Sequence, residues 1–87
     1  MENEEFVQQI REKIERLTER PVELIVDESE TTQLQVNLER QIPQVIVGAE
    51  IFEYAGFARM CVEYVVESIR QERAIEELEF HLLLARN

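Results

Sequence analysis

FARMCVEYVVESIRQERAIEELEFHLLLARN, residues Phe57–Asn87, is the stretch that decides the fold. At the angular spacing of a helix, the apolar side chains of its first half cover roughly 240°, whereas a surface helix usually shows a stripe little over 100° wide. Farther on, apolar residues fall on two opposite sides of a predicted helix, with Ile75, Leu78 and Leu82 on one side and Phe80 and Leu84 on the other. Two apolar faces need two partners, and the second is expected to be another protein or another copy of the chain.

A single helix from Phe57 to Arg86 would extend about 45 Å, which is long for so small a domain. No Pro or Gly interrupts this segment, but the apolar stripe changes phase near Glu72–Ala74. A kink or a short turn is therefore predicted there.

The N-terminal segment predicts a second helix, from Asn3 to Glu19. Asn3 is a favourable cap, and Pro21 restricts the residue before it, which ends the helix. Apolar residues recur at helical spacing and predict one buried stripe, formed by Phe6, Ile10, Ile14 and Leu17.

Three strands are predicted between the helices because apolar and polar residues alternate there. The inward set comprises Val22, Leu24 and Val26 in the first strand, Leu34, Val36 and Leu38 in the second, and Val45, Val47, Ala49 and Ile51 in the third. Short polar connections favour an antiparallel meander in chain order. Its predicted register places Leu24 opposite Val36, and Val36 opposite Val47.

The other face of this sheet is mostly polar, but two apolar residues, Ile25 and Ile46, lie within it. A solvated face is the simpler interpretation. A modest contact surface is the alternative, because interfaces are poor in charge and accommodate amide groups.

The chain is strongly acidic, with a net charge of −10 over 87 residues. Such a field repels nucleic acid and anionic lipid, so neither is expected as a partner. No apolar stretch approaches the ~18 residues of a membrane span, and the acidic N-terminus lacks the order of a signal peptide. Cys61 is the only cysteine, which excludes an internal disulfide and favours a cytoplasmic location.

Catalytic, cofactor-binding and metal-binding patterns are not recognisable, so neither an enzyme nor a bound cofactor or metal is expected. His81 is the only histidine, and no second ligand stands at zinc-site spacing. Cys61 is predicted to be buried and therefore a poor nucleophile. Glycine-rich phosphate loops are absent from the sequence.

Two smaller features stay open. An aromatic corner either fills one end of the core or walls a small ligand pocket, and it consists of Phe52, Tyr54 and Phe57. Three arginines either bind an anion together or pair with glutamates within helical reach; the arginines are Arg59, Arg70 and Arg73, and the glutamates are Glu63, Glu67 and Glu77.

The sequence thus predicts one α+β domain over residues 1–87, in the order α-β-β-β-α-α, with the helices packed on one face of the meander. The favoured function is a non-catalytic protein-interaction module that forms a homodimer or docks on a larger protein. Its predicted interaction residues are Val62, Val66, Ile75, Leu78, Phe80, Leu82, Leu83 and Leu84. The alternatives are an acidic decoy that inhibits a basic partner, and a ligand-binding domain or enzyme whose site forms across a dimer from His81 or the aromatic corner.

Overall fold

The structure, a computed structural model, describes residues 2–29, 32–53 and 55–79. In these ranges the elements are α1 (Glu2–Thr18), β1 (Glu23–Asp27), β2 (Gln33–Asn37), β3 (Gln44–Gly48), the short 3-10 helix η1 (Ala49–Glu53), α2 (Ala55–Gln71) and β4 (Ile75–Glu79). The α+β class and the N-terminal helix are confirmed. The C-terminal part differs from the prediction, because β4 stands where a further helix was expected.

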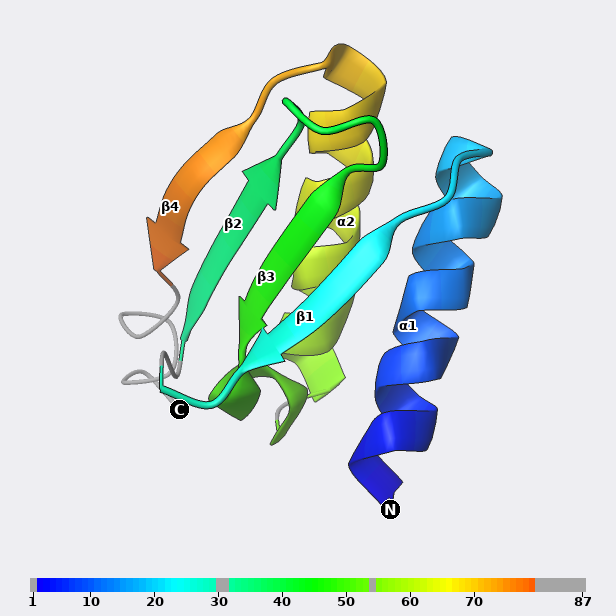
Figure 1. Ribbon diagram of the computed structural model, residues 1–87. Helices are drawn as coiled ribbons and strands as arrows, with labels where there is room; N and C mark the ends of the chain where they lie inside the picture. The colour runs from blue at the N-terminus through cyan, green and yellow to red at the C-terminus, as the bar shows by residue number, and fades with distance from the viewer. Residues whose placement is uncertain (1, 30–31, 54, 80–87) are drawn as a thin grey trace.

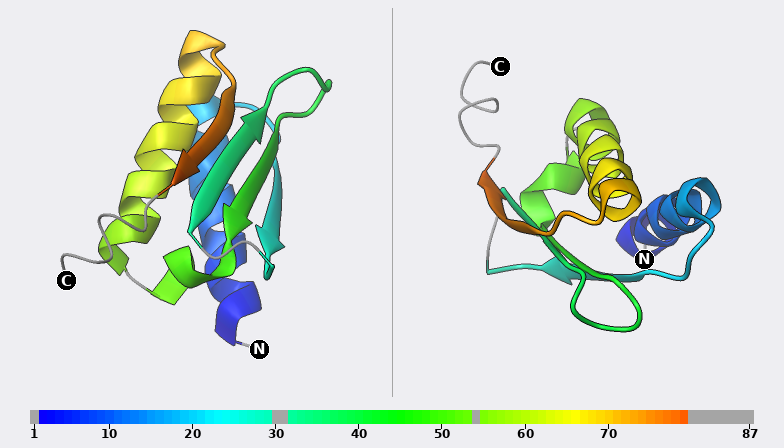
Figure 2. Two further views of the ribbon diagram at one scale, coloured as in Figure 1. Left: turned by 90° about the vertical axis from the view of Figure 1, so that its left-hand side faces the viewer. Right: turned by 90° about the horizontal axis from the view of Figure 1, so that it is seen from above.

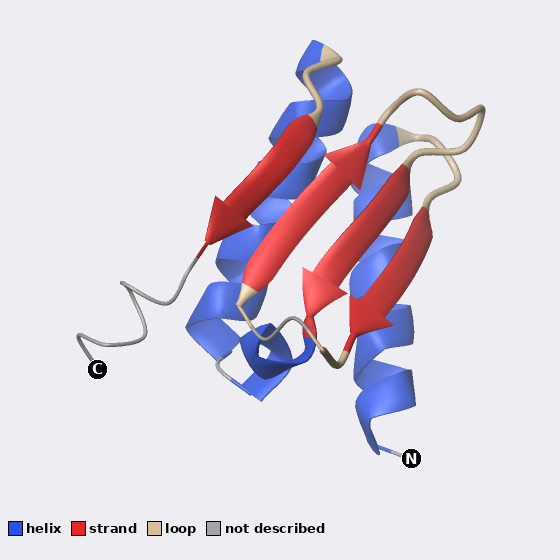
Figure 3. Cartoon of the chain, turned by 60° about the vertical axis from the view of Figure 1, so that its left-hand side comes forward, coloured by secondary structure: helices blue, strands red, loops and turns tan. Residues whose placement is uncertain are grey.

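The strands form one four-stranded sheet in the order β1-β3-β2-β4 (Figure 1). Both described helices lie on the same face of this sheet, α1 beside β1 and α2 behind the other strands (Figure 2). The opposite face is left uncovered by the described residues, as the view in Figure 3 shows. The molecule therefore has two layers, with its core between the sheet and the helix pair.

Most of the wide apolar arc of α2 is covered by other parts of the chain. The sheet covers one side of the arc and α1 covers the other, since α2 contacts both β2 and α1. Val62 and Val66, on the side towards α1, are each only 7% exposed. Ala58, Cys61, Val65 and Ile69 belong to the same buried cluster. Tyr64 of the same helix is 43% exposed, so part of the arc stays at the surface.

The predicted antiparallel meander is wrong, because β3 lies between β1 and β2. β1 pairs with β3 in parallel, with Leu24 opposite Val45 and Ile25 opposite Ile46. A parallel pair needs a long return path, and here residues 28–43, which include β2, provide it. The predicted pairing of Leu24 with Val36 therefore does not form. Alternation assigns a residue to a face of the sheet but does not say which strand lies beside it.

The pairing of β2 with β3 is antiparallel as predicted, but its register differs by two residues. Val36 lies opposite Val45 rather than Val47. The strand ends at Asn37, whose side-chain Oδ1 accepts the backbone N–H of Glu39 at 2.9 Å, so the connection is longer than the predicted tight turn. An even shift keeps every inward residue inward, and Leu34, Val36, Val45 and Val47 are all buried.

The third strand is also shorter than predicted. It ends at Gly48, and η1 follows. Ile51 is fully buried as expected, but it reaches the core from η1 rather than from a strand.

The end of α2 at Gln71 confirms the predicted break near Glu72–Ala74, but the chain continues as β4. β4 pairs antiparallel with β2, with Val36 opposite Ile75 and Leu34 opposite Leu78. Three residue steps on β4 thus match two on β2, which is a β-bulge. The bulge places Ile75 and Leu78 on the same face although they are three residues apart, the spacing that predicted a helix.

Each helix is followed directly by a residue in the left-handed region, Glu19 with φ 57° after α1 and Glu72 with φ 54° after α2. After α2, the N–H of Arg73 donates to the carbonyl of Ser68 at 3.0 Å, and the N–H of Glu72 donates to that of Ile69 at 3.3 Å. This is the Schellman arrangement, in which glycine usually occupies the position of Glu72.

We expect Glu72→Gly to raise the free energy of unfolding by about 0.5–1 kcal/mol, because glycine has no Cβ to strain in this conformation. Glu63→Gly, in the exposed interior of α2, is the control and should lower it by about 1 kcal/mol. Urea unfolding of both variants measures the difference. Destabilisation by Glu72→Gly would contradict the left-handed turn.

Candidate functional site

The uncovered face of the sheet carries two isoleucines side by side, one in the middle of the edge strand β1 and one in the middle of the inner strand β3. Ile25 of β1 and Ile46 of β3 are direct partners in the parallel ladder, and Gln35 of β2 lies opposite Ile46 on the other side. Ile25 is 38% exposed, and Ile46 is partly exposed. The sequence placed both isoleucines on this face, but its register put Asn37 opposite Ile46, where the structure has Gln35.

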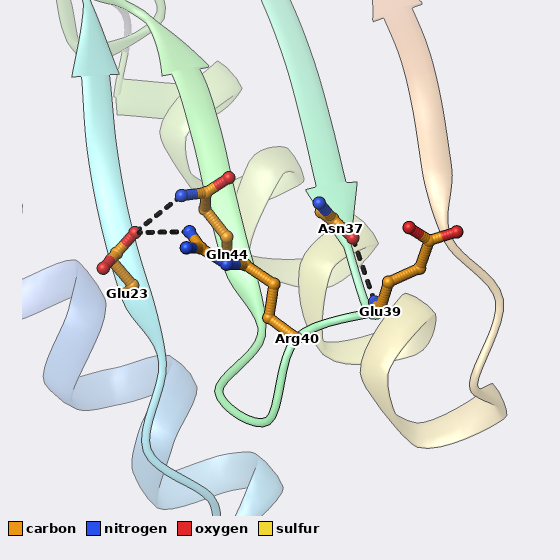
Figure 4. Close-up of polar contacts among 5 residues, drawn as sticks. All are labelled: Glu23, Asn37, Glu39, Arg40 and Gln44. Carbon is orange, nitrogen blue, oxygen red and sulfur yellow. Dashed lines mark hydrogen bonds and ion pairs between the residues drawn. The ribbon is translucent and has the colours of Figure 1, made fainter.

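Polar side chains at one end of this face are held in place by hydrogen bonds (Figure 4). Gln44 donates from Nε2 to Glu23 Oε1 at 2.7 Å, and Arg40 Nη1 lies 3.9 Å from the same oxygen. Since its nitrogen is used in this way, Gln44 presents its carbonyl oxygen as a hydrogen-bond acceptor. The contacts tie β1, β3 and the β2–β3 loop together across the face.

At the other end, Gln33 of β2 donates from Nε2 to Glu77 Oε1 of β4 at 2.6 Å. Asp27 accepts hydrogen bonds from the backbone N–H and the hydroxyl of Ser29, at 2.9 and 2.6 Å. The rim of the face is therefore acidic at both of its edge strands.

A hollow of about 320 Å³ lies on this face beside the β2–β4 bulge. Its apolar part is formed by Val36, Ile46, Ala74 and Ile75, and its polar part by Gln35, Asn37, Glu39, Gln44 and Glu76. Within the described residues, the carboxylates of Glu39 and Glu76 accept no hydrogen bond and form no ion pair. Sequence reasoning missed this hollow. Its signal was the Glu76-Glu77 pair, which breaks the alternation of β4 at the bulge.

A second groove, of about 480 Å³, follows the seam between α1 and α2. It is lined by Lys13, Leu17, Arg59, Val62, Glu63, Val66, Glu67 and Arg70. Its charges are mixed, and Arg70 donates from Nη2 to the backbone carbonyl of Leu17 at 2.9 Å. The lining of this groove therefore favours neither a positively nor a negatively charged partner.

The predicted pairing of the arginines with helical glutamates does not form. Among the described residues, no ion pair joins Arg59, Arg70 or Arg73 to Glu63, Glu67 or Glu77. Arg59 and Arg70 line the seam between the helices, whereas Arg73 lies in the turn before β4 and not among the lining residues.

The structure describes four of the eight predicted interaction residues, and none of these four is exposed. Val62 and Val66 are buried between the helices, and Ile75 and Leu78 of β4 pack against the core. The other four lie outside the described residues, namely Phe80, Leu82, Leu83 and Leu84. His81 and Tyr54 lie outside them too, as do the side chains of Phe52 and Phe57, so the aromatic corner stays a prediction.

Burial controls the chemistry of Cys61. It is only 4% exposed, and desolvation raises the pKa of its thiol from 9.0 to about 12. The thiol therefore keeps its proton at neutral pH and is a weak nucleophile. In the described part of the chain, no group of three or more His, Cys, Asp or Glu residues is placed to hold a metal ion. None of the described helices is long and apolar enough to span a bilayer.

The Cys61 thiol should make stability fall at alkaline pH. The unfolded chain loses this proton near pH 9, whereas the folded chain keeps it until about pH 12, so rising pH favours the unfolded state across this window. Urea unfolding between pH 8 and pH 10.5, compared with Cys61→Ala, isolates the effect. Parallel pH profiles for the two proteins would contradict the burial of the thiol.

Comparisons with known proteins supply no family: no family model, no curated protein and no solved structure matches this chain. Fold alone would not assign an activity in any case, because one architecture serves many functions.

Proposed function

We propose that the protein is a small, non-catalytic, cytoplasmic protein-interaction module, and that a basic protein docks on the uncovered face of its sheet. The observation that carries this proposal is the adjacent pair Ile25 and Ile46, on a face that the described helices leave open. An apolar pair with an amide beside it and charges at the margin of the face has the composition of a protein interface.

Charge selects the class of partner. Among the described side chains, the margin of the face carries five carboxylates, on Glu23, Asp27, Glu39, Glu76 and Glu77, and one cation, Arg40, which already lies beside Glu23. The net charge of −10 extends the same sign over the whole molecule. Lys and Arg on a partner complement this margin, whereas a second copy docked face to face would bring two acidic margins together.

A second candidate function, an acidic inhibitor that covers a basic partner's own binding surface, is favoured by the same carboxylates. Glutamates fixed at the margin, such as Glu23 beside Gln44, can occupy cations that otherwise bind phosphate. Docking and inhibition would use the same surface of this protein. They differ in whether the partner's own binding surface is blocked.

The test is affinity capture from the native cell at low and high salt, with the intact protein as bait. The expected partner is basic, and its recovery falls steeply as salt rises from about 50 to 500 mM, because screening weakens the charged margin. A partner without excess positive charge, or recovery that ignores salt, would contradict the proposal.

Homodimer formation through the C-terminal segment, 80–87, is the other form of the interaction proposal. Light scattering separates the two by comparing the full chain with a chain that ends at Glu79, which keeps β4. A dimer formed only by the full chain would support self-association. A monomer in both cases, at high micromolar concentration, would count against it.

A further inference from the structure

We propose that the hollow beside the β2–β4 bulge receives one arginine side chain of the docked partner. This inference rests on the proposed function, since it assigns an anchor to the same face. The volume of about 320 Å³ lies at the lower end of the ~300–1,000 Å³ of pockets that hold small molecules. An occupant of this size is one side chain rather than a helix.

The lining of the hollow suits a side chain with an apolar stem and a cationic head. Ile46 supplies apolar surface on the uncovered face, along which a stem of methylene groups can lie. Glu39 and Glu76 supply two carboxylates that no described cation neutralises. The nearest arginine in sequence, Arg40, points to Glu23 instead (Figure 4).

The acceptors are partly fixed before the partner arrives. Asn37 Oδ1 accepts the N–H of Glu39, which fixes the backbone that carries this carboxylate. The amide nitrogen of Gln44 is held by Glu23, so its Oε1 is a third acceptor at the wall of the hollow. Fixing these groups in advance lowers the entropy lost on binding.

Arginine fits this set of acceptors better than lysine. The guanidinium has five N–H donors in one plane and can bond two carboxylates and an amide oxygen at once. An ammonium is a compact charge with three donors and is more strongly hydrated, so its transfer from water costs more.

The probes are three short peptides that differ only at the central residue: acetyl-Lys-Ile-Arg-Ile-Lys-amide, the same peptide with citrulline, and the same peptide with Lys. Each is titrated into the full-length ¹⁵N-labelled protein and followed by NMR. The arginine peptide should shift the amides of the hollow, those of Asn37, Glu39, Ile46 and Glu76. It should bind about tenfold more tightly than the citrulline peptide, with the lysine peptide between them.

Charge-matched variants separate a specific anchor from general attraction. Glu39→Gln with Glu76→Gln should remove the difference between arginine and citrulline. Glu4→Gln with Glu5→Gln removes the same charge from exposed positions of α1 and should preserve it.

Three outcomes would overturn the inference. If arginine and citrulline peptides bind the sheet face equally, or if the α1 variants abolish the difference as fully as the hollow variants do, the arginine anchor is wrong but the docking face stands. If no peptide shifts any residue of the face, the docking proposal fails together with the anchor.

Discussion

Replacing Leu34 with Ala is expected to lower the free energy of unfolding by about 2–5 kcal/mol. Leu34 is fully buried, and its strand, β2, is an inner strand of the sheet. It lies opposite Val47 of β3 on one side and Leu78 of β4 on the other. Truncation therefore leaves a cavity where three strands meet the helices, and the lost packing adds to the lost burial.

Leu17→Ala is the matched control, because the same atoms are removed from a leucine that is 40% exposed at the end of α1. Its cost should stay below about 1 kcal/mol. Urea unfolding measures both, and Leu34→Ala consumes a large part of the 5–15 kcal/mol typical of a small domain. Equal losses for the two variants would contradict the inner position of β2.

The second large effect concerns docking. Ile46→Lys should weaken binding of the basic partner by more than about tenfold while the domain stays folded. The substitution removes apolar surface from the centre of the face and places a cation against a basic partner. Because Ile46 is partly exposed and alternates with the buried Val45 and Val47, it lies on the uncovered face, and the free energy of unfolding should change by less than about 1 kcal/mol.

Ile42→Lys makes the same chemical change at a residue that is 47% exposed in the loop between β2 and β3, outside the sheet. It should leave affinity within about threefold of the wild type. Calorimetric titration with the captured partner compares the variants. If both substitutions weakened binding equally, charge alone would govern binding, and the isoleucine pair would not be the docking site.

Local patterns predicted much of this fold. Helical spacing from Phe6 to Leu17 indicated α1, and strict alternation around Leu34 and Val36 indicated the buried side of the sheet. Each signal depends only on which side of one helix or strand faces the core, so it does not require knowing which element lies next to it. The inward residues survived the wrong register for the same reason.

The order of the strands in the sheet could not be predicted in this way. The polar connection after β1 suits a hairpin, yet β3 occupies the place beside β1. Alternation is equally satisfied by either neighbour, and the choice depends on contacts between residues far apart in the chain.

β4 was mistaken for a helix because a bulge changes the period of a strand. Ile75 and Leu78 both pack towards the core at a spacing of three, which is typical of a helix. Two glutamates between two apolar residues therefore fit either a helix or a bulged strand. Here the pairing with β2 selects the strand.

The candidate site was predicted in part. The sequence identified Ile25 and Ile46 as apolar residues on a polar face, which the register of β1 and β3 now places side by side. The hollow required the bulge, the loop that carries Glu39 and the wall provided by Gln44, three features that only the folded chain brings together.

Site-specific photo-crosslinking in the native cell tests the docking face most directly. A photoreactive residue is placed either at position 46, on the uncovered face, or at position 63, on the exposed side of α2. The account predicts adducts with a basic protein from position 46 and none from position 63. Adducts from position 63 alone, or adducts from position 46 only with a second copy of the chain, would contradict it.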